Sequence, residues 1–223
     1  MVLASVRAKR RSSMRIAIIG AGAVGGALAR GWTRAGHDIV FGVSDPSAAK
    51  HAALRAQGFA VASNREAAGA ASAIALAVPW AAIEDAVASL GDVAGKLILD
   101  ATNPLAFGPD GLSLAIGFTD SGGEQVQRLA SGASVFKTMN QVGYRVMDAA
   151  TGYPTAPSMF VAGDDEGRKI EVMGLVADLG FEPLDCGGLR MARLLEPYAM
   201  VWINQVAVRG APDTSAFALM HRR

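Results

Sequence analysis

The sequence Met14-Arg-Ile-Ala-Ile-Ile-Gly-Ala-Gly-Ala-Val-Gly-Gly26 joins an apolar run directly to a glycine-rich turn. The glycines have the spacing Gly-x-Gly-x-x-Gly, at Gly20, Gly22 and Gly25. In this motif the first glycine permits a tight strand-to-helix turn. The second leaves room for a pyrophosphate beside bare backbone, and the third lets the helix lie close to the strand. The N-terminus of the following helix favours an anion through its free N–H groups and its dipole.

The context of the motif makes it specific. An amphipathic segment over 24–35 and a second apolar run over 37–43 follow it, which predicts a strand, a helix and a second strand. The stretch therefore predicts nucleotide binding rather than a purely structural turn. The residues expected to hold the cofactor there are Gly20, Gly22, Ala23, Val24 and Gly25.

Beyond this unit the chain alternates predicted strands and helices, which is typical of a mostly parallel sheet covered on both faces. The expected strands are 59–62, 73–78, 96–100, 134–139, 158–162 and 182–185. One helix is expected to begin at 65, and another to begin near the acids at 164–166 and end at 179. Further helices are expected over 81–90, 124–130 and 189–208, with a long loop over 107–123.

We therefore predict an α/β fold, a Rossmann-type doubly wound, mostly parallel sheet with a small C-terminal α/β lobe. The expected division is a flexible tail over 1–13, a dinucleotide-binding domain over 14–150, and a lobe over 151–223 that completes an acceptor site and a dimer interface. The dimer is expected through the final helix, whose apolar residues cover more than one face. They are Met200, Val201, Trp202, Ile203, Val206 and Val208.

Composition excludes several classes of partner. The net charge of +1 gives no electrostatic reason to expect nucleic acid. No apolar stretch reaches the about 18 residues needed to span a bilayer. The single cysteine, Cys186, excludes an internal disulfide and fits a reducing compartment. A cytoplasmic location is therefore expected.

The end of the second strand bears on the choice of cofactor. An acid there would bind the ribose hydroxyls of NAD, but this chain has Ser44 at that place, so NADP is permitted. Ser44 could hydrogen-bond a 2′-phosphate and Lys50 or His51 could supply charge, although Asp45 would oppose it. The alternative is that these residues merely cap the following helix.

Three further segments end neighbouring strands at the same edge of the sheet: Val78-Pro-Trp80, Thr102-Asn-Pro104 and Met139-Asn-Gln141. Each alone is typical of a turn, but together they predict a ligand site, because open α/β sheets bind ligands at this edge. The histidines, in contrast, are expected in a turn (His37), on a surface helix (His51) and in the tail (His221). They predict neither a metal site nor an acid–base pair.

Five segments form a recognisable set: Gly20-Ala-Gly-Ala-Val-Gly25, Ala77-Val-Pro-Trp80, Asp100-Ala-Thr-Asn-Pro104, Val161-Ala-Gly-Asp-Asp165 and Leu184-Asp-Cys-Gly-Gly-Leu-Arg-Met-Ala-Arg-Leu-Leu-Glu196. In this order, over about 15–209, the chain resembles the coenzyme F420-dependent NADP oxidoreductase family. The resemblance implies a Rossmann domain for NADP(H), a small lobe that helps to hold a deazaflavin, and direct hydride exchange between the two coenzymes. Certain metalloreductases have a similar cytoplasmic domain that reduces flavin, so the acceptor stays open.

Carried over by position, the resemblance implies a nicotinamide site at Val78, Pro79, Trp80, Thr102 and Asn103. Asn103 and Asn140 would position the rings without transferring a proton. Many members have an arginine in place of Ser44, and commonly Asp-Ala-Gly-Pro in place of Asp185-Cys-Gly-Gly188. These departures leave the strength of NADP preference and the acceptor contacts open.

Hydride exchange between stacked rings needs no catalytic acid, because proximity and orientation supply much of the barrier reduction. Lys137 is the one nearby base that could transfer a proton if it faced the nicotinamide. One alternative is a 3-hydroxyacid or imine dehydrogenase, but its usual larger helical domain does not match the β-α-β-α pattern after Gly152. Another is a non-enzymatic NADP(H)-sensing module, although no attached effector segment is visible.

Overall fold

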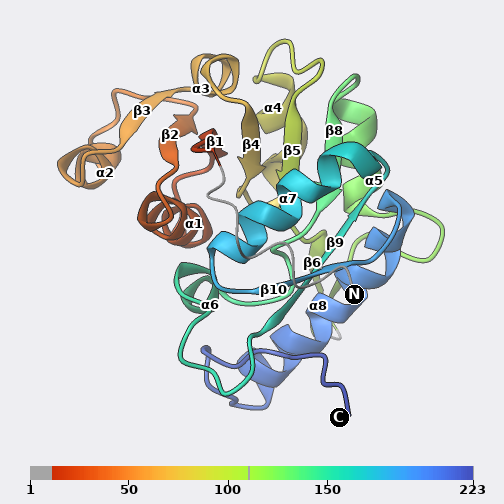
Figure 1. Cartoon of the computed structure of the whole chain (residues 1–223). Coiled ribbons are helices and arrows are strands. Elements are labelled where there is room, and N and C mark those ends of the chain that lie inside the picture. The colour runs from red at the N-terminus through yellow and green to blue at the C-terminus, as the bar shows by residue number, and fades with distance from the viewer. Residues whose placement is uncertain (1–11, 110, 223) are drawn as a thin grey trace.

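The computed structural model describes residues 12–109 and 111–222. Eight strands form one sheet in the order β10-β9-β8-β5-β4-β1-β2-β3 (Figure 1). The strands are β1 (Arg15–Ile19), β2 (Asp38–Val43), β3 (Ala60–Ser63), β4 (Ala73–Leu76), β5 (Leu97–Asp100), β8 (Ser134–Lys137), β9 (Ser158–Gly163) and β10 (Glu182–Asp185). All neighbours pair in parallel except β8 and β9. The segment β3-β2-β1-β4-β5-β8 has the strand order of dinucleotide-binding sheets, which confirms the predicted fold class.

Helices cover both faces of the sheet because successive strand residues point to opposite sides. Ile16 and Ile18 pack in one core with α1 (Ala23–Arg34), α6 (Tyr144–Asp148) and α7 (Glu166–Asp178). Ala17 and Ile19 pack in the other core with α3 (Asn64–Ala70), α4 (Ile83–Ala88) and α5 (Gly122–Leu129). Burial on both faces explains why the central strands are continuous apolar runs.

The segment after residue 150 extends the same sheet, since β9 pairs with β8. Trp32 of α1 also donates a hydrogen bond of 2.9 Å to the carbonyl of Leu175 in α7. The last helix, α8 (Ala192–Ile203), runs diagonally at the lower right of Figure 1 and contacts α5. A boundary at residue 150 stays a prediction, and residues 1–11 of the predicted tail lie outside the described residues.

Three elements differ from expectation. The predicted loop over 107–123 overlaps an antiparallel hairpin of β6 (Leu105–Gly108) and β7 (Gly111–Leu114), whose half-exposed strands are too short to show a period. Helix α6 was not expected, because its single turn is too short to carry a helical pattern. The final helix ends at Ile203 and continues as a π-helical turn, η5 (Asn204–Val208). Among the described residues, no helix is long and apolar enough to cross a membrane.

Candidate functional site

The glycine turn has the backbone geometry that the motif predicts. Gly20 has a φ of +110°, and a Cβ there would lie 2.4 Å from the carbonyl oxygen of Ala77. A Cβ at Gly25 would lie 2.1 Å from the carbonyl oxygen of Gly20, whereas one at Gly22 would meet nothing within 4 Å. Gly22 is also the N-cap of α1 and makes no side-chain capping bond. The turn therefore presents open space and the free end of a helix, which suits a phosphate group.

A pocket of about 1030 Å³ opens from this turn along the carboxyl ends of β1 to β4. Its lining includes several residues predicted for the cofactor, namely Gly20, Gly22, Ser44, Val78 and Pro79. It also includes Lys50, His51, Asn64, Arg65 and Asp85. The volume and the position at the strand ends fit the nucleotide part of a dinucleotide.

Asn64 and Arg65 were missed by sequence reasoning. They begin α3, directly after β3, at the edge of the sheet where β2 also ends. The rule that drew attention to the ends of β4 and β5 applies equally to β3. In the structure, α3 begins with a capping box in which Ser63 and Glu66 bond each other's backbone.

The prediction that the histidines lie at the surface was wrong for His37 and His51. His51 is 5% exposed and His37 is 8% exposed, so neither lies on the surface. His37 accepts a hydrogen bond from the backbone N–H of Met14 at Nδ1, and its Nε2 lies 3.1 Å from Asp178. Within 12–109 and 111–222, no three or more His, Cys, Asp or Glu side chains gather in a way that could hold a metal.

The other predicted residues lie outside the lining of this pocket. Trp80 packs against Gly122 at the start of α5, where a Cβ would lie 3.0 Å from the indole ring. Asn103 and Asn140 are brought together, as expected for two neighbouring strand ends. Nδ2 of Asn103 donates to the carbonyl of Asn140 at 2.9 Å, and Nδ2 of Asn140 donates to Oδ1 of Asn103 at 3.0 Å.

The backbone before Asn140 is strained. Met139 is fully buried and has a φ of +61°, in the left-handed region that non-glycine residues rarely occupy. This turn directs Asn140 toward Asn103 and toward α8, where it donates a second bond of 3.2 Å to the carbonyl of Leu195. Gln141 donates to Oδ1 of Asn140 at 3.1 Å. Both asparagine side chains are therefore fixed by protein contacts.

Beneath these asparagines lies a buried ionic cluster of Asp100, Lys137 and Glu196. The ammonium of Lys137 lies 2.9 Å from each carboxylate, and the three side chains are at most 1% exposed. Burial would lower the pKa of Lys137, but the charges of Asp100 and Glu196 outweigh this and raise it. Lys137 therefore stays charged inside the protein and does not face a ligand.

The cluster also organises the loops around it. Asp100 accepts hydrogen bonds from the backbone N–H and the hydroxyl of Thr102, at 2.9 and 2.7 Å. Glu196 accepts from the backbone N–H groups of Gly122 and Gly123, each at 3.0 Å. The loop after β5 and the start of α5, against which Trp80 packs, are thereby joined to α8.

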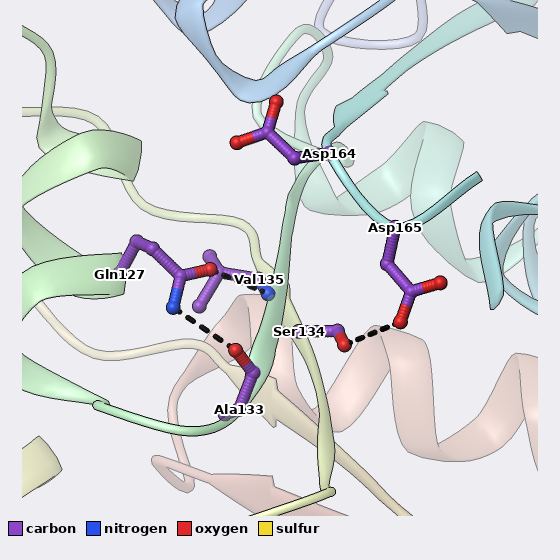
Figure 2. A pocket seen from close by; sticks show the side chains of 6 residues that line it. All are labelled: Gln127, Ala133, Ser134, Val135, Asp164 and Asp165. Carbon is purple, nitrogen blue, oxygen red and sulfur yellow. Dashed lines mark hydrogen bonds between the residues drawn. The ribbon is translucent and has the colours of Figure 1, made fainter. Parts of the chain in front are cut away.

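A second, smaller hollow of about 280 Å³ lies between α5 and the start of α7. Figure 2 shows the hydrogen bonds of Gln127, Ser134 and Asp165, and Asp164 accepts a further one of 2.8 Å from the backbone N–H of Leu189. Gln127 donates to the carbonyl of Ala133 and accepts from the backbone of Val135, while Ser134 donates to Asp165. Because these polar groups already have partners in the protein, the hollow gives no reason to expect a second ligand there.

The comparisons agree with this geometry. Residues 15–104 match the sequence model of the family described as NADP oxidoreductase coenzyme F420-dependent. The crystal structure of a provisionally named F420-dependent NADP-reductase from Arthrobacter sp. FB24 superposes with a TM-score of 0.84 at 30% identity, covering 94% of this chain and 100% of that one. A hypothetical protein, SMa0349 from Sinorhizobium meliloti, superposes with a TM-score of 0.69 at 30% identity. The match covers 79% of this chain and 86% of that one.

A reductive aminase from Aspergillus terreus, solved with NADPH4, cyclohexanone and allyl amine, is similar at the level of the fold. It has a TM-score of 0.63 and 24% identity, and the match covers 88% of this chain but 62% of the aminase. The relative from Arthrobacter is matched over its whole length at higher identity. This chain therefore belongs to the coenzyme F420-dependent NADP oxidoreductase family.

Proposed function

We propose that this protein is an NADP(H)-dependent oxidoreductase that exchanges a hydride directly between the nicotinamide and a deazaflavin, coenzyme F420, or a flavin. Family membership supports the class of reaction. The observation that carries the site is the open space at Gly22 beside a pocket lined by the carboxyl ends of four parallel strands. A Cβ at Gly22 meets nothing within 4 Å, so the backbone there is open to a pyrophosphate.

In this proposal each part of the site has its own role in binding. The turn at Gly20, Gly22 and Gly25 holds the pyrophosphate, and Val78 and Pro79 form the apolar wall that leads toward the nicotinamide. Asn103 and Asn140 are positioning residues, because their side chains bond each other and α8 rather than open space. When bound, NADP(H) supplies or accepts the hydride.

The burial of Lys137 favours a ring coenzyme over a small alcohol or imine as partner. Lys137 was the one basic candidate, and it is fully buried between two carboxylates. Hydride exchange between two rings needs orientation and exclusion of water, but no general acid. The fixed asparagines and the apolar wall at the strand ends supply both.

The decisive experiment is stopped-flow absorbance with NADPH and, in turn, coenzyme F420, FMN, FAD, ketoacids and imines. We expect oxidation of NADPH with F420 first and with free flavins second. Asn140→Leu should lower kcat by ~10²-fold, because a small misplacement of the rings is costly, and should leave NADPH affinity unchanged. Gln57→Leu, which also replaces an amide by leucine but at an exposed site after α2 (Ala52–Ala56), should have no effect. Turnover with ketoacids or imines alone would contradict the proposal.

We also infer a homodimer through α8. Leu194 and Val201 lie seven residues apart on this helix and are 61% and 49% exposed, and Val208 beyond it is 70% exposed. Trp202, by contrast, is used within the chain, since it donates to the carbonyl of Ser215. Light scattering should give the dimer mass at micromolar concentration, and Val201→Arg should give the monomer mass. Ile170→Arg, on α7 at 69% exposure, is the control and should remain dimeric.

A further inference from the structure

Two polar atoms in the nucleotide pocket have no hydrogen-bond partner among the described residues. They are Nε2 of His51 and Oδ1 of Asn64. His51 is 5% exposed, so water has little access to its ring. Buried polar groups are nearly always paired, and an unpaired one costs free energy. A ligand that enters this pocket is therefore expected to supply both missing partners.

The place of His51 relative to the sheet narrows the identity of its partner. In dinucleotide-binding sheets the 2′-position of the adenosine ribose lies at the carboxyl end of the second strand. Ser44 follows β2 directly, and Lys50 and His51 lie in the turn η2 (Ala49–His51) that comes next. All three line the pocket, so it has a hydroxyl, an ammonium and an imidazole on the residues that follow this strand end.

The charged residues at this end of the pocket favour a second anionic group beside the pyrophosphate, such as a 2′-phosphate. Asp45, the acid that would oppose a 2′-phosphate, is not part of the lining. Its Oδ1 accepts hydrogen bonds from the hydroxyl and the backbone N–H of Ser47, at 2.6 and 2.9 Å, which lower its pKa, so Asp45 keeps a negative charge that also acts on His51. The ionisable groups that do line the pocket are Lys50, His51, Arg65 and Asp85.

We propose that His51 is the specificity-determining residue for the 2′-phosphate of NADP(H), with Nε2–H donating to a phosphate oxygen, an inference that rests on the proposed function. Ser44 and Lys50 are exposed, so on binding they exchange hydrogen bonds to water for hydrogen bonds to phosphate. The net gain in binding free energy from such an exchange is small. His51 gains a bond that it otherwise lacks. Asn64 Oδ1 accepts from a group that NAD and NADP share, such as the adenine amino group.

The test uses calorimetric titration of the full chain with 2′,5′-ADP and with 5′-AMP, which differ by the 2′-phosphate alone. His51→Leu should weaken 2′,5′-ADP by about tenfold, the scale of one hydrogen bond to a charged group, and should leave 5′-AMP within about twofold. His51→Gln, which keeps an N–H donor, should restore most of the affinity. Asn64→Ala is the matched comparison and should weaken both probes equally.

Thermal unfolding distinguishes a role of His51 in binding from a role in the stability of the fold. Because Nε2 of His51 has no partner within residues 12–109 and 111–222, His51→Leu should not lower the melting temperature. Equal weakening of both probes by His51→Leu, or no weakening of either, would overturn the assignment while leaving the proposed function intact. Failure of the unmodified protein to bind NADPH would instead overturn the proposed function and this inference with it.

Discussion

Replacing Lys137 with methionine is expected to lower the free energy of unfolding by about 3–5 kcal/mol, because it leaves two buried carboxylates without a counter-charge. Asp100 and Glu196 are at most 1% exposed and each lies 2.9 Å from the ammonium. Urea denaturation followed by circular dichroism measures the loss. A protein of marginal stability would then be largely unfolded at ordinary temperature.

Lys169→Met provides the matched control. The side chain of Lys169 is 2% exposed, but its partners Glu166 and Asp185 are 72% and 47% exposed. Water can solvate those carboxylates once the lysine is gone, so the loss should be about 1 kcal/mol or less. If the two substitutions cost the same, the buried cluster would not contribute as the geometry indicates.

The second large effect separates two glycines that lie three residues apart. Gly22→Ala should leave the fold intact, since a Cβ there meets nothing within 4 Å, but should weaken NADPH by at least about tenfold because the methyl group occupies the expected place of the pyrophosphate. Gly25→Ala should destabilise the protein by about 1–3 kcal/mol, since its Cβ would lie 2.1 Å from the carbonyl oxygen of Gly20.

Thermal unfolding and fluorescence titration of NADPH measure the two effects separately. Gly69→Ala in α3 is the control, because a Cβ there also meets nothing within 4 Å and alanine favours a helix. It should raise stability slightly and leave the affinity unchanged. A Gly22→Ala variant that binds NADPH normally would show that the pyrophosphate does not approach this turn.

The nucleotide half of the site was predictable because its signals are local in the sequence. Gly20, Gly22 and Gly25 lie in one turn, and the strand that precedes them is buried on both faces. The juxtaposition of Asn103 and Asn140 was also predictable, since both follow neighbouring parallel strands. The roles proposed for these residues in binding and positioning remain predictions.

The parts that were missed depend on contacts between distant segments. Nothing near Lys137 in the sequence indicates that its partners are Asp100 and Glu196, which lie on β5 and α8. The burial of His51 likewise depends on packing around the ends of β2 and β3, and its own short turn gives no periodic pattern. Hydrophobic periodicity predicts which face of an element is buried, but not which polar groups meet inside.

The position of Glu196 in the chain has a consequence for synthesis on the ribosome. The last residue that lines the nucleotide pocket is Ser89, so the whole lining leaves the ribosome well before α8 does. Asp100 and Lys137 then meet long before Glu196 and Leu195 emerge to bind Lys137 and Asn140. The ionic cluster and the bond from Asn140 to Leu195 are therefore expected to be completed only when α8 is released.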